Sequence, residues 1–372
     1  MIKSTKALFL CNEKFLDDSL DGGGVKLCTD EFKALIKTNF IVEEFPVTYN
    51  QSFLYRVKKK IGISAYEDYD LKQYEAALRK KIGEEKIKYV FLNLSNTAPF
   101  AKMVKSIGRE VTIILCSHGN ESGDFLHETV MHQKYTSLKK KSAFYNLGKM
   151  LASESECRQY IDLVLTVSGV EEELEKWIGA KKIYMVPRII GQEILEEHII
   201  QGRLGFLSDL SHEPNFYGIN ELCKAIISTG GEVPEIRLAG GGPERGKLLS
   251  EQYNFVEYLG YLPEEALKKE LSTWSFALNP VFYYSRGVST KLGKYLSLGI
   301  PVMTTAIGMR GYMWHDGELP VCKTKIEMAE KSIKFSRDAE AIKYYRKEVK
   351  KIQASTPEYE NMMGDILSLL HN

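Results

Sequence analysis

Short apolar runs alternate with amphipathic segments along the first half of the chain. Such runs are typical of strands covered on both faces of a parallel sheet, whereas apolar residues at helical spacing predict helices between them. The predicted strands are 6–11, 40–47, 88–94, 111–116, 163–167 and 183–186, and the predicted helices are 25–37, 71–81, 101–107, 133–151 and 171–178.

The same rhythm restarts after Pro187. Strands are predicted at 203–207, 235–239, 255–258, 275–278 and 302–304, and helices at 216–228, 244–251, 264–273 and 290–298. Alternation of this kind predicts the α/β class, here two Rossmann-like domains that face each other across a cleft.

The domain boundaries follow from this restart. We expect a first domain at 1–187, a second at 188–355 and a C-terminal helix at 356–372. The apolar residues of that last helix need a covering surface, and we expect the first domain to supply it; they are Ile366, Leu367, Leu369 and Leu370.

Composition narrows the function classes. The 372 residues are 44% hydrophobic and 27% charged, which is ordinary for a globular protein, and 50 basic against 49 acidic residues argue against a protein that coats nucleic acid. No apolar run approaches the roughly 20 residues of a spanning helix. Six scattered cysteines without a paired spacing favour a reducing cytoplasm and predict no metal site.

The basic charge is concentrated in one part of the chain. Between Gln51 and Met150 there are 18 Lys and Arg against 10 Asp and Glu, and the clusters 58–60, 79–81 and 139–141 supply most of this excess. These clusters are either solvated helix faces or a surface that meets an anionic acceptor or the inner face of a membrane.

Polar residues after the predicted strands are the candidates for chemistry, since ligands of open parallel sheets bind beyond the carboxyl ends of the strands. His118 and Glu121 follow one strand and could contact sugar hydroxyls, or they belong to a hydrogen-bonded loop. Earlier in the chain, Gly22, Gly23 and Gly24 form either a ligand-approaching glycine loop or a plain turn.

Two segments of the second half suit a nucleotide. Gly240, Gly241 and Gly242 follow a strand, and Pro243 is placed to open a helix. The segment 285–294 ends a loop with Ser289 or Thr290 as a helix cap. The first amides of that helix could bind a diphosphate, and Arg286, Lys291 and Lys294 would add positive charge nearby. The alternative is that the segment is an ordinary connection between two parallel strands.

Taken in order, these segments resemble family-four glycosyltransferases (group 1) of the GT-B fold. The similar segments are the glycine turn 22–24, the loop 118–121, the strand 163–168, Val186 with Pro187, and the segments 237–243, 258–261 and 287–302.

The resemblance implies transfer of a sugar from a nucleotide-sugar, with retention of configuration and without a metal or other cofactor. The second domain would hold the donor through the glycines 240–242 with Pro243, through Tyr261, and through the segment 285–294, which includes Ser285, Gly287 and Val288. His118 would lie near the reacting sugar, with Glu121 as a further catalytic candidate, and Lys291 would stabilise the leaving diphosphate. The basic stretch around 58–60 suggests that the acceptor is a glycan or lipid-linked sugar in surface polysaccharide synthesis.

The chain also departs from the family pattern. Arg286 and Lys294, eight positions apart, replace two glutamates, and a lysine cannot accept a hydrogen bond from ribose. Ser208 and Asn215 fall near the places of an Arg and a Lys that usually bind phosphate. Either local cations compensate, or the protein is a non-catalytic binding or scaffold protein; a nucleotide-sugar epimerase of the same fold is the third alternative.

Overall fold

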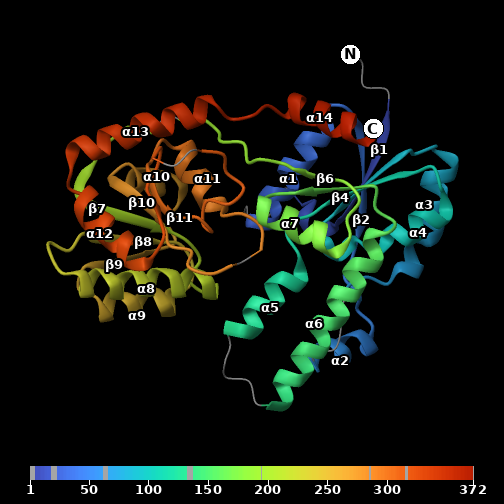
Figure 1. Ribbon diagram of the computed structural model, residues 1–372, viewed down its shortest axis with the longest axis horizontal. Helices are drawn as coiled ribbons and strands as arrows, with labels where there is room; N and C mark the ends of the chain where they lie inside the picture. The colour runs from blue at the N-terminus through green and yellow to red at the C-terminus, as the bar shows by residue number, and fades with distance from the viewer. Residues whose placement is uncertain are drawn as a thin grey trace. The chain divides into compact units, whose positions relative to one another are not determined.

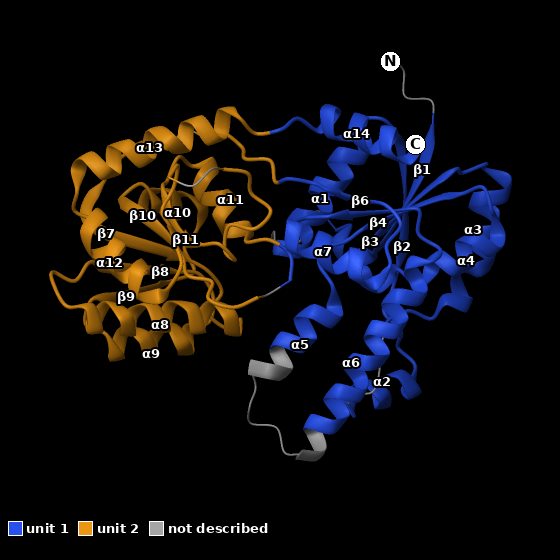
Figure 2. Cartoon of the chain, viewed as in Figure 1, with its two compact units in different colours: residues 1–187, 285–287, 357–372 blue, residues 188–284, 288–356 orange. Residues whose placement is uncertain are grey.

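Two six-stranded parallel sheets form the framework of the chain (Figure 1). They belong to two compact units, one made of residues 1–187, 285–287 and 357–372, the other of 188–284 and 288–356 (Figure 2). The computed structural model describes residues 5–17, 23–61, 66–131, 137–193, 195–284, 286–314 and 317–371, but not the side chains of 128–131 and 137–139. Gly22 and Ser285 therefore lie outside the described residues.

The sheet of the first unit has the strand order β2-β1-β3-β4-β5-β6. Its strands are β1 Lys6–Asn12, β2 Ile41–Val47, β3 Tyr89–Asn93, β4 Thr112–Cys116, β5 Leu163–Thr166 and β6 Ile183–Met185. The α-helices of this unit are α1 Gly24–Lys37, α2 Phe53–Lys60, α3 Glu75–Arg79, α4 Phe100–Ile107, α5 Glu121–Met131, α6 Ser137–Arg158, α7 Gly169–Ile178 and α14 Tyr359–His371.

The second sheet has the order β12-β11-β10-β7-β8-β9. Its strands are β7 Ile200–Leu207, β8 Glu235–Ala239, β9 Val256–Gly260, β10 Trp274–Asn279, β11 Val302–Thr305 and β12 Val321–Cys322. Its helices are α8 Glu213–Thr229, α9 Pro243–Gln252, α10 Glu264–Leu271, α11 Thr290–Ser297, α12 Lys325–Phe335 and α13 Ala339–Ala354.

The predicted α/β class with two Rossmann-like domains is confirmed. The apolar runs became the central strands because side chains on both of their faces are buried; Ala7, Leu8, Phe9, Leu10 and Cys11 of β1 have no exposed surface. The predictions were poorer for several helices of the first unit. They missed α2 and α5 and began α6 too early, and the helix predicted at 71–81 is three short pieces.

The C-terminal helix α14 packs within the first unit. Lys182 Nζ donates to the carbonyl of Leu369 at 2.9 Å, and Tyr184 Oη contacts the Asp365 carboxylate at 3.2 Å. Ile366 is buried, whereas Leu367, Leu369 and Leu370 keep part of their surface exposed.

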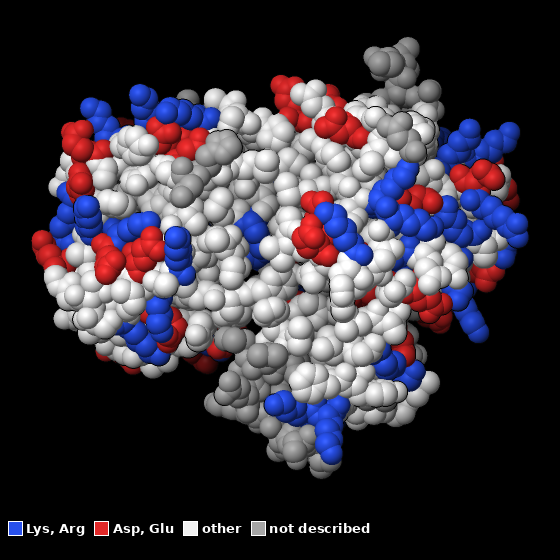
Figure 3. Space-filling model, viewed as in Figure 1, with Lys and Arg blue, Asp and Glu red and all other residues white. Residues whose placement is uncertain are grey.

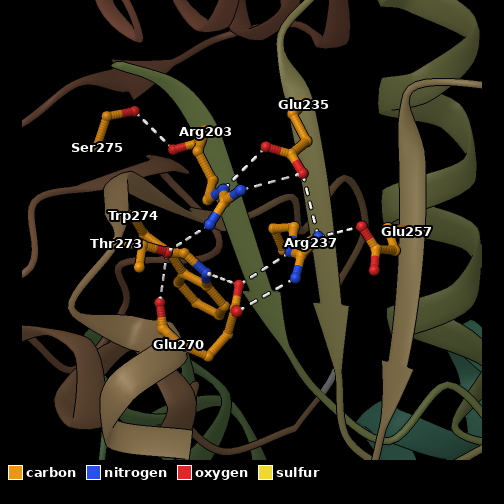
Figure 4. Close-up of polar contacts among 8 residues, drawn as sticks. All are labelled: Arg203, Glu235, Arg237, Glu257, Glu270, Thr273, Trp274 and Ser275. Carbon is orange, nitrogen blue, oxygen red and sulfur yellow. Dashed lines mark hydrogen bonds and ion pairs between the residues drawn. The ribbon is translucent and has the colours of Figure 1, made fainter. Parts of the chain in front are cut away.

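A network of ion pairs and hydrogen bonds ties four strands of the second sheet together (Figure 4). Arg203 of β7 pairs with Glu235 of β8 at 2.8 Å, and Arg237 pairs with Glu257 of β9 and with Glu270 of α10. Trp274 at the start of β10 donates from Nε1 to Glu270 at 2.9 Å. Arg237 thus serves the sheet, although it lies only three positions before Gly240 in sequence.

The ring of Trp274 also requires a glycine on the neighbouring strand. A Cβ at Gly205 would lie 1.8 Å from Cδ2 of that ring. We expect Gly205→Ala to lower the free energy of unfolding by about 3 kcal/mol, because an overpacked core must distort. Urea unfolding measures this change. The control is Gly191→Ala, whose Cβ would meet its nearest atom at 3.7 Å; equal stability losses in both variants would contradict the packing described here.

Candidate active site

The glycine segment after β8 packs against the loop after β7. Gly240 has φ +123°, and a Cβ there would lie 2.2 Å from the carbonyl oxygen of Ser208; Gly242 has φ +79°, and its Cβ would lie 2.5 Å from the nitrogen of Ser211. The Gly240 nitrogen donates to the carbonyl of Gly260 at 2.8 Å. The glycines predicted a close approach of the backbone to a ligand. In the structure they also allow the loop after β8 to pack closely against the loop after β7.

A cavity of about 260 Å³ opens at this edge of the second sheet. It lies beyond the carboxyl ends of β7, β8 and β9, where ligands of such sheets bind. Tyr261 is largely exposed, so its ring stands at the rim. The lining residues are Leu207, Ser208, Asp209, Gly240, Gly241, Tyr261, Leu262 and Leu267.

Lys291, in the first turn of α11, carries a cation beside this cavity. Its Nζ donates to Asn215 Oδ1 at 2.6 Å and to Ser208 Oγ at 3.1 Å, and it lies 4.6 Å from the ring centroid of Phe206. Both acceptors are neutral, and no carboxylate in the described part of the chain pairs with it. Burial lowers the pKa of Lys291 to about 7, so the ammonium group lacks the stabilisation that an anion would provide.

Ser208 and Asn215 are thus the acceptors of this lysine. They are the two residues that fall near the places of an Arg and a Lys in the family that the sequence resembles. Ser208 and Asn215 come from the loop after β7 and from α8, and both point their oxygens at Lys291. The cation at this place comes from α11 instead, with the two substituted residues holding it in position.

Ser289 precedes α11 but does not cap it as predicted. Its Oγ donates to Asn279 Oδ1 at 2.9 Å, and no side chain caps the helix. The reason lies in Asn279, which is fully buried at the end of β10 and donates from Nδ2 to Thr304 Oγ1 and to the Gly308 carbonyl. Its remaining oxygen needs a donor. Among the described residues, the first amides of α11, beginning at Thr290, consequently receive no side-chain acceptor.

The other two predicted donor-site cations have carboxylate partners. Lys294 Nζ lies 2.9 Å from the carboxylate of Glu193. Arg286 belongs to the first unit, where it forms an ion pair with Glu121 and lies 3.6 Å from Asp124. Of the three predicted cations, Lys291 is thus the one without a carboxylate partner in the described part of the chain, and local sequence does not show the distant partners of the other two.

The remaining predicted donor contacts have structural roles. Pro243 opens α9 at its first position. Val288 packs against the apolar core of the second unit. Gly287 has φ +71°, and its nitrogen donates to Glu171 Oε1 at 2.8 Å. Gly23, predicted as part of the first domain's glycine loop and not of the donor site, precedes α1. A Cβ there would meet no atom within 4 Å, so packing does not demand a glycine.

In the first unit, buried polar side chains end three strands. His118 Nε2 lies 2.9 Å from Asn93 Oδ1, and Asn93 Nδ2 donates to Thr29 Oγ1 at 2.9 Å. Asn12, the last residue of β1, donates to Tyr69 Oη at 3.3 Å. Since Asn93 offers its carbonyl oxygen, His118 donates from Nε2, and its ring is held in one orientation.

Glu121 begins α5 and is bound to Arg286 rather than free in the described part of the chain. Burial raises the pKa of this carboxyl group, although the guanidinium opposes the shift. The two segments also touch through backbone: a Cβ at Gly119 would lie 2.7 Å from Cβ of Arg286, and a Cβ at Gly287 would lie 2.9 Å from the carbonyl of His118.

Helix α7 supports both segments with two glutamates one turn apart. Glu171 accepts from the Gly287 nitrogen, and Glu175 accepts from Asn120 Nδ2 at 3.0 Å. Glu175 also pairs at 2.7 Å with Arg158, and neither of these two side chains is exposed. Sequence reasoning missed these residues, since their spacing on α7 looks like that of an ordinary charged helix face.

Comparison with known families identifies the second unit. Residues 201–338 match the family model of glycosyl transferases group 1. The chain carries a group 1 glycosyltransferase domain. This match supports the predicted enzyme class, a glycosyltransferase. A search by sequence among curated proteins finds no significant match.

Solved glycosyltransferases share the fold along the chain. Sucrose-phosphate synthase from Thermosynechococcus elongatus superposes with a TM-score of 0.71 at 14% identity, covering 99% of this chain and 98% of that one. The lipopolysaccharide outer core galactosyltransferase WaaB gives 0.60 at 14% identity, covering 98% and 99%. TarM gives 0.60 at 13% identity, covering 82% of this chain and 59% of its own. At these identities the likeness shows the fold, which is that of GT-B glycosyltransferases.

The Arg158–Glu175 pair allows a test of how the first unit holds its His118 loop. We expect Arg158→Met to lower the free energy of unfolding by about 3 kcal/mol, because it leaves a buried carboxylate without its cation. Adding Glu175→Gln should restore much of the loss, and urea unfolding of the single and double variants measures both. Purely additive losses would show that the two charges are not coupled.

Proposed function

We propose that the protein transfers a sugar from a nucleotide-sugar to a glycan or lipid-linked acceptor, with the donor diphosphate bound at Lys291. The observation that carries this proposal is a desolvated ammonium group beside a cavity, held by Ser208 and Asn215 with no carboxylate partner among the described residues. A diphosphate would supply the missing negative charge. The uncapped amides of α11 would add hydrogen-bond donors to the same anion.

In this proposal the main catalytic contribution is stabilisation of the leaving diphosphate. Negative charge grows on that group as the bond to the sugar breaks, and a fixed cation together with helix amides stabilises it without rearrangement. Because Lys291 and α11 would meet this charge, the proposal includes no metal ion. We further propose retention of configuration and a role for His118 at the reacting sugar, supported by the fixed orientation of its ring.

The donor class is a nucleoside diphosphate sugar. A structure of S. aureus TarM contains UDP and α-GlcNAc-glycerol, and this relative of similar fold suggests UDP-sugars as the first probes. Transfer of the sugar to an acceptor at the inner, cytoplasmic face of a membrane would fit the basic clusters of the first unit. No helix in the described part of the chain is long and apolar enough to cross a bilayer.

A binding protein without turnover is the second candidate. It is favoured by the ion pairs of Arg286 with Glu121 and of Lys294 with Glu193, which engage charged groups expected at an active donor site. Release of free sugar or sugar transfer from a bound nucleotide-sugar would exclude it. The epimerase alternative draws less support, because Glu121, its candidate acid–base carboxylate, is paired with a guanidinium.

Donor affinity should depend on pH through Lys291. The diphosphate binds the protonated lysine, and the pKa of about 7 means that this form is lost as the pH rises through 7. For UDP-glucose, whose diphosphate does not titrate in this range, we expect Kd to rise about fivefold from pH 7 to pH 8 and nearly tenfold over the next unit. Calorimetry in buffers of different ionisation enthalpy should show proton uptake on binding.

Two matched lysine variants test the site. Lys291→Met should weaken UDP-glucose binding about a hundredfold and remove its pH dependence. Lys294→Met, which removes a lysine of the same helix that already pairs with Glu193, should change Kd far less. Equal losses in the two variants, or no nucleotide-sugar binding by the native protein, would contradict the proposed donor site.

A further inference from the structure

Helix α2 of the first unit exposes an apolar face. Phe53 is 77% exposed, Leu54 64% and the C-cap residue Ile61 56%, and Val57 is also exposed. At about 100° per residue these four positions fall within an arc of about 100° on one side of the helix. Tyr55, the buried residue of α2, lies on the other side.

The buried side of α2 is fastened to the first unit. Tyr55 Oη donates to the Asp68 carboxylate at 2.5 Å, and the Tyr55 nitrogen donates to Ser52 Oγ, the N-cap. Asn50, just before the helix, donates from its nitrogen to the carbonyl of Asp68 at 2.7 Å. These contacts fix the rotation of α2 and leave its apolar row directed away from the buried side.

Basic residues border this apolar row. Lys58 and Lys60 lie on opposite sides of it by the same helical spacing. Lys58 pairs with Glu67, which also reaches Lys149 of α6 at 3.8 Å and so links α2 to that helix. Arg56, Lys59 and Lys60 have no carboxylate partner within the part of the chain that the structure describes. Elsewhere on the face seen in Figure 3, many basic and acidic side chains lie next to each other.

We propose that α2 binds an anionic lipid bilayer, with Phe53, Leu54, Val57 and Ile61 inserted at the headgroup level and the bordering lysines on the lipid phosphates. An apolar face on a short helix with lysines on its flanks is the combination that partitions into an anionic interface. A helix face that stays in solvent would account for the lysines, but it would not account for four exposed apolar side chains in one row. The inference deepens the proposed function, since a lipid-linked acceptor would be presented at such a surface.

Co-sedimentation of the full chain with lipid vesicles tests the apolar row. The double variant Leu54→Ser with Ile61→Ser should lower the partition coefficient about a hundredfold on vesicles of phosphatidylcholine and phosphatidylglycerol. The matched control is Leu248→Ser with Ile227→Ser, which changes the same residue types at exposures of 49% and 57% in the second unit, and it should bind as the native chain does. Equal binding by both variants would overturn the proposal.

The charges are tested separately. Arg56→Gln with Lys60→Gln, which removes the two exposed cations on one flank of the row, should weaken binding to the anionic vesicles about thirtyfold, at about 1 kcal/mol per charge, and added salt should have a similar effect. Binding that does not respond to lipid charge or salt would contradict the assigned lipid class. A Phe53→Trp variant should be quenched by lipids brominated in the acyl chain; absence of quenching on bound protein would contradict insertion of α2.

UDP-glucose affinity, measured on the same samples, separates this inference from the proposed function. If the native chain binds UDP-glucose but no vesicles, the lipid inference fails and the donor site stands. If it binds vesicles through α2 but no nucleotide-sugar, the donor site fails and the lipid inference stands. Sedimentation velocity tests one other occupant of the row. If the native chain self-associates and the Leu54→Ser with Ile61→Ser variant does not, the row is an interface between copies and the lipid proposal is overturned.

Discussion

The ammonium group of Lys291 is the constraint on which the candidate donor site depends. Removing a cation from water is costly unless an anion or strong acceptors replace the water, and here two neutral oxygens, from Ser208 and Asn215, do so only in part. This partial compensation lowers the pKa to about 7. The cavity, the glycine segment and the uncapped start of α11 all lie around this one group, so a bound diphosphate would complete its environment.

Buried asparagines at strand ends set the geometry of both units. Asn12 and Asn93 end β1 and β3, and Asn279 ends β10. Each is almost completely buried and directs the residue that follows the sheet edge: Asn93 orients His118, and Asn279 takes the hydroxyl of Ser289 away from the helix end. A polar side chain at this depth must be satisfied, and the loops therefore have few alternative conformations.

Much of the fold followed from periodicity, because buried strands read as apolar runs whatever their tertiary partners. The position of α11 and of Lys291 was also predictable, since a polar loop, a helix pattern and Gly299 mark that segment. The partners of the charged residues were not. Arg286 meets Asp124 across 162 positions of sequence and Lys294 meets Glu193 across 101, and no local pattern reports such contacts. The strand-end asparagines were a visible signal that the apolar-run analysis did not use.

The most direct test of this account is an NMR titration of the Lys291 side chain, assigned by comparison with Lys291→Met. The account predicts a pKa near 7 in the free protein and a rise of about two or more units once UDP-glucose is bound, because the diphosphate stabilises the charged form. A pKa near the ordinary lysine value in the free protein, or one that UDP-glucose leaves unchanged at saturation, would contradict it.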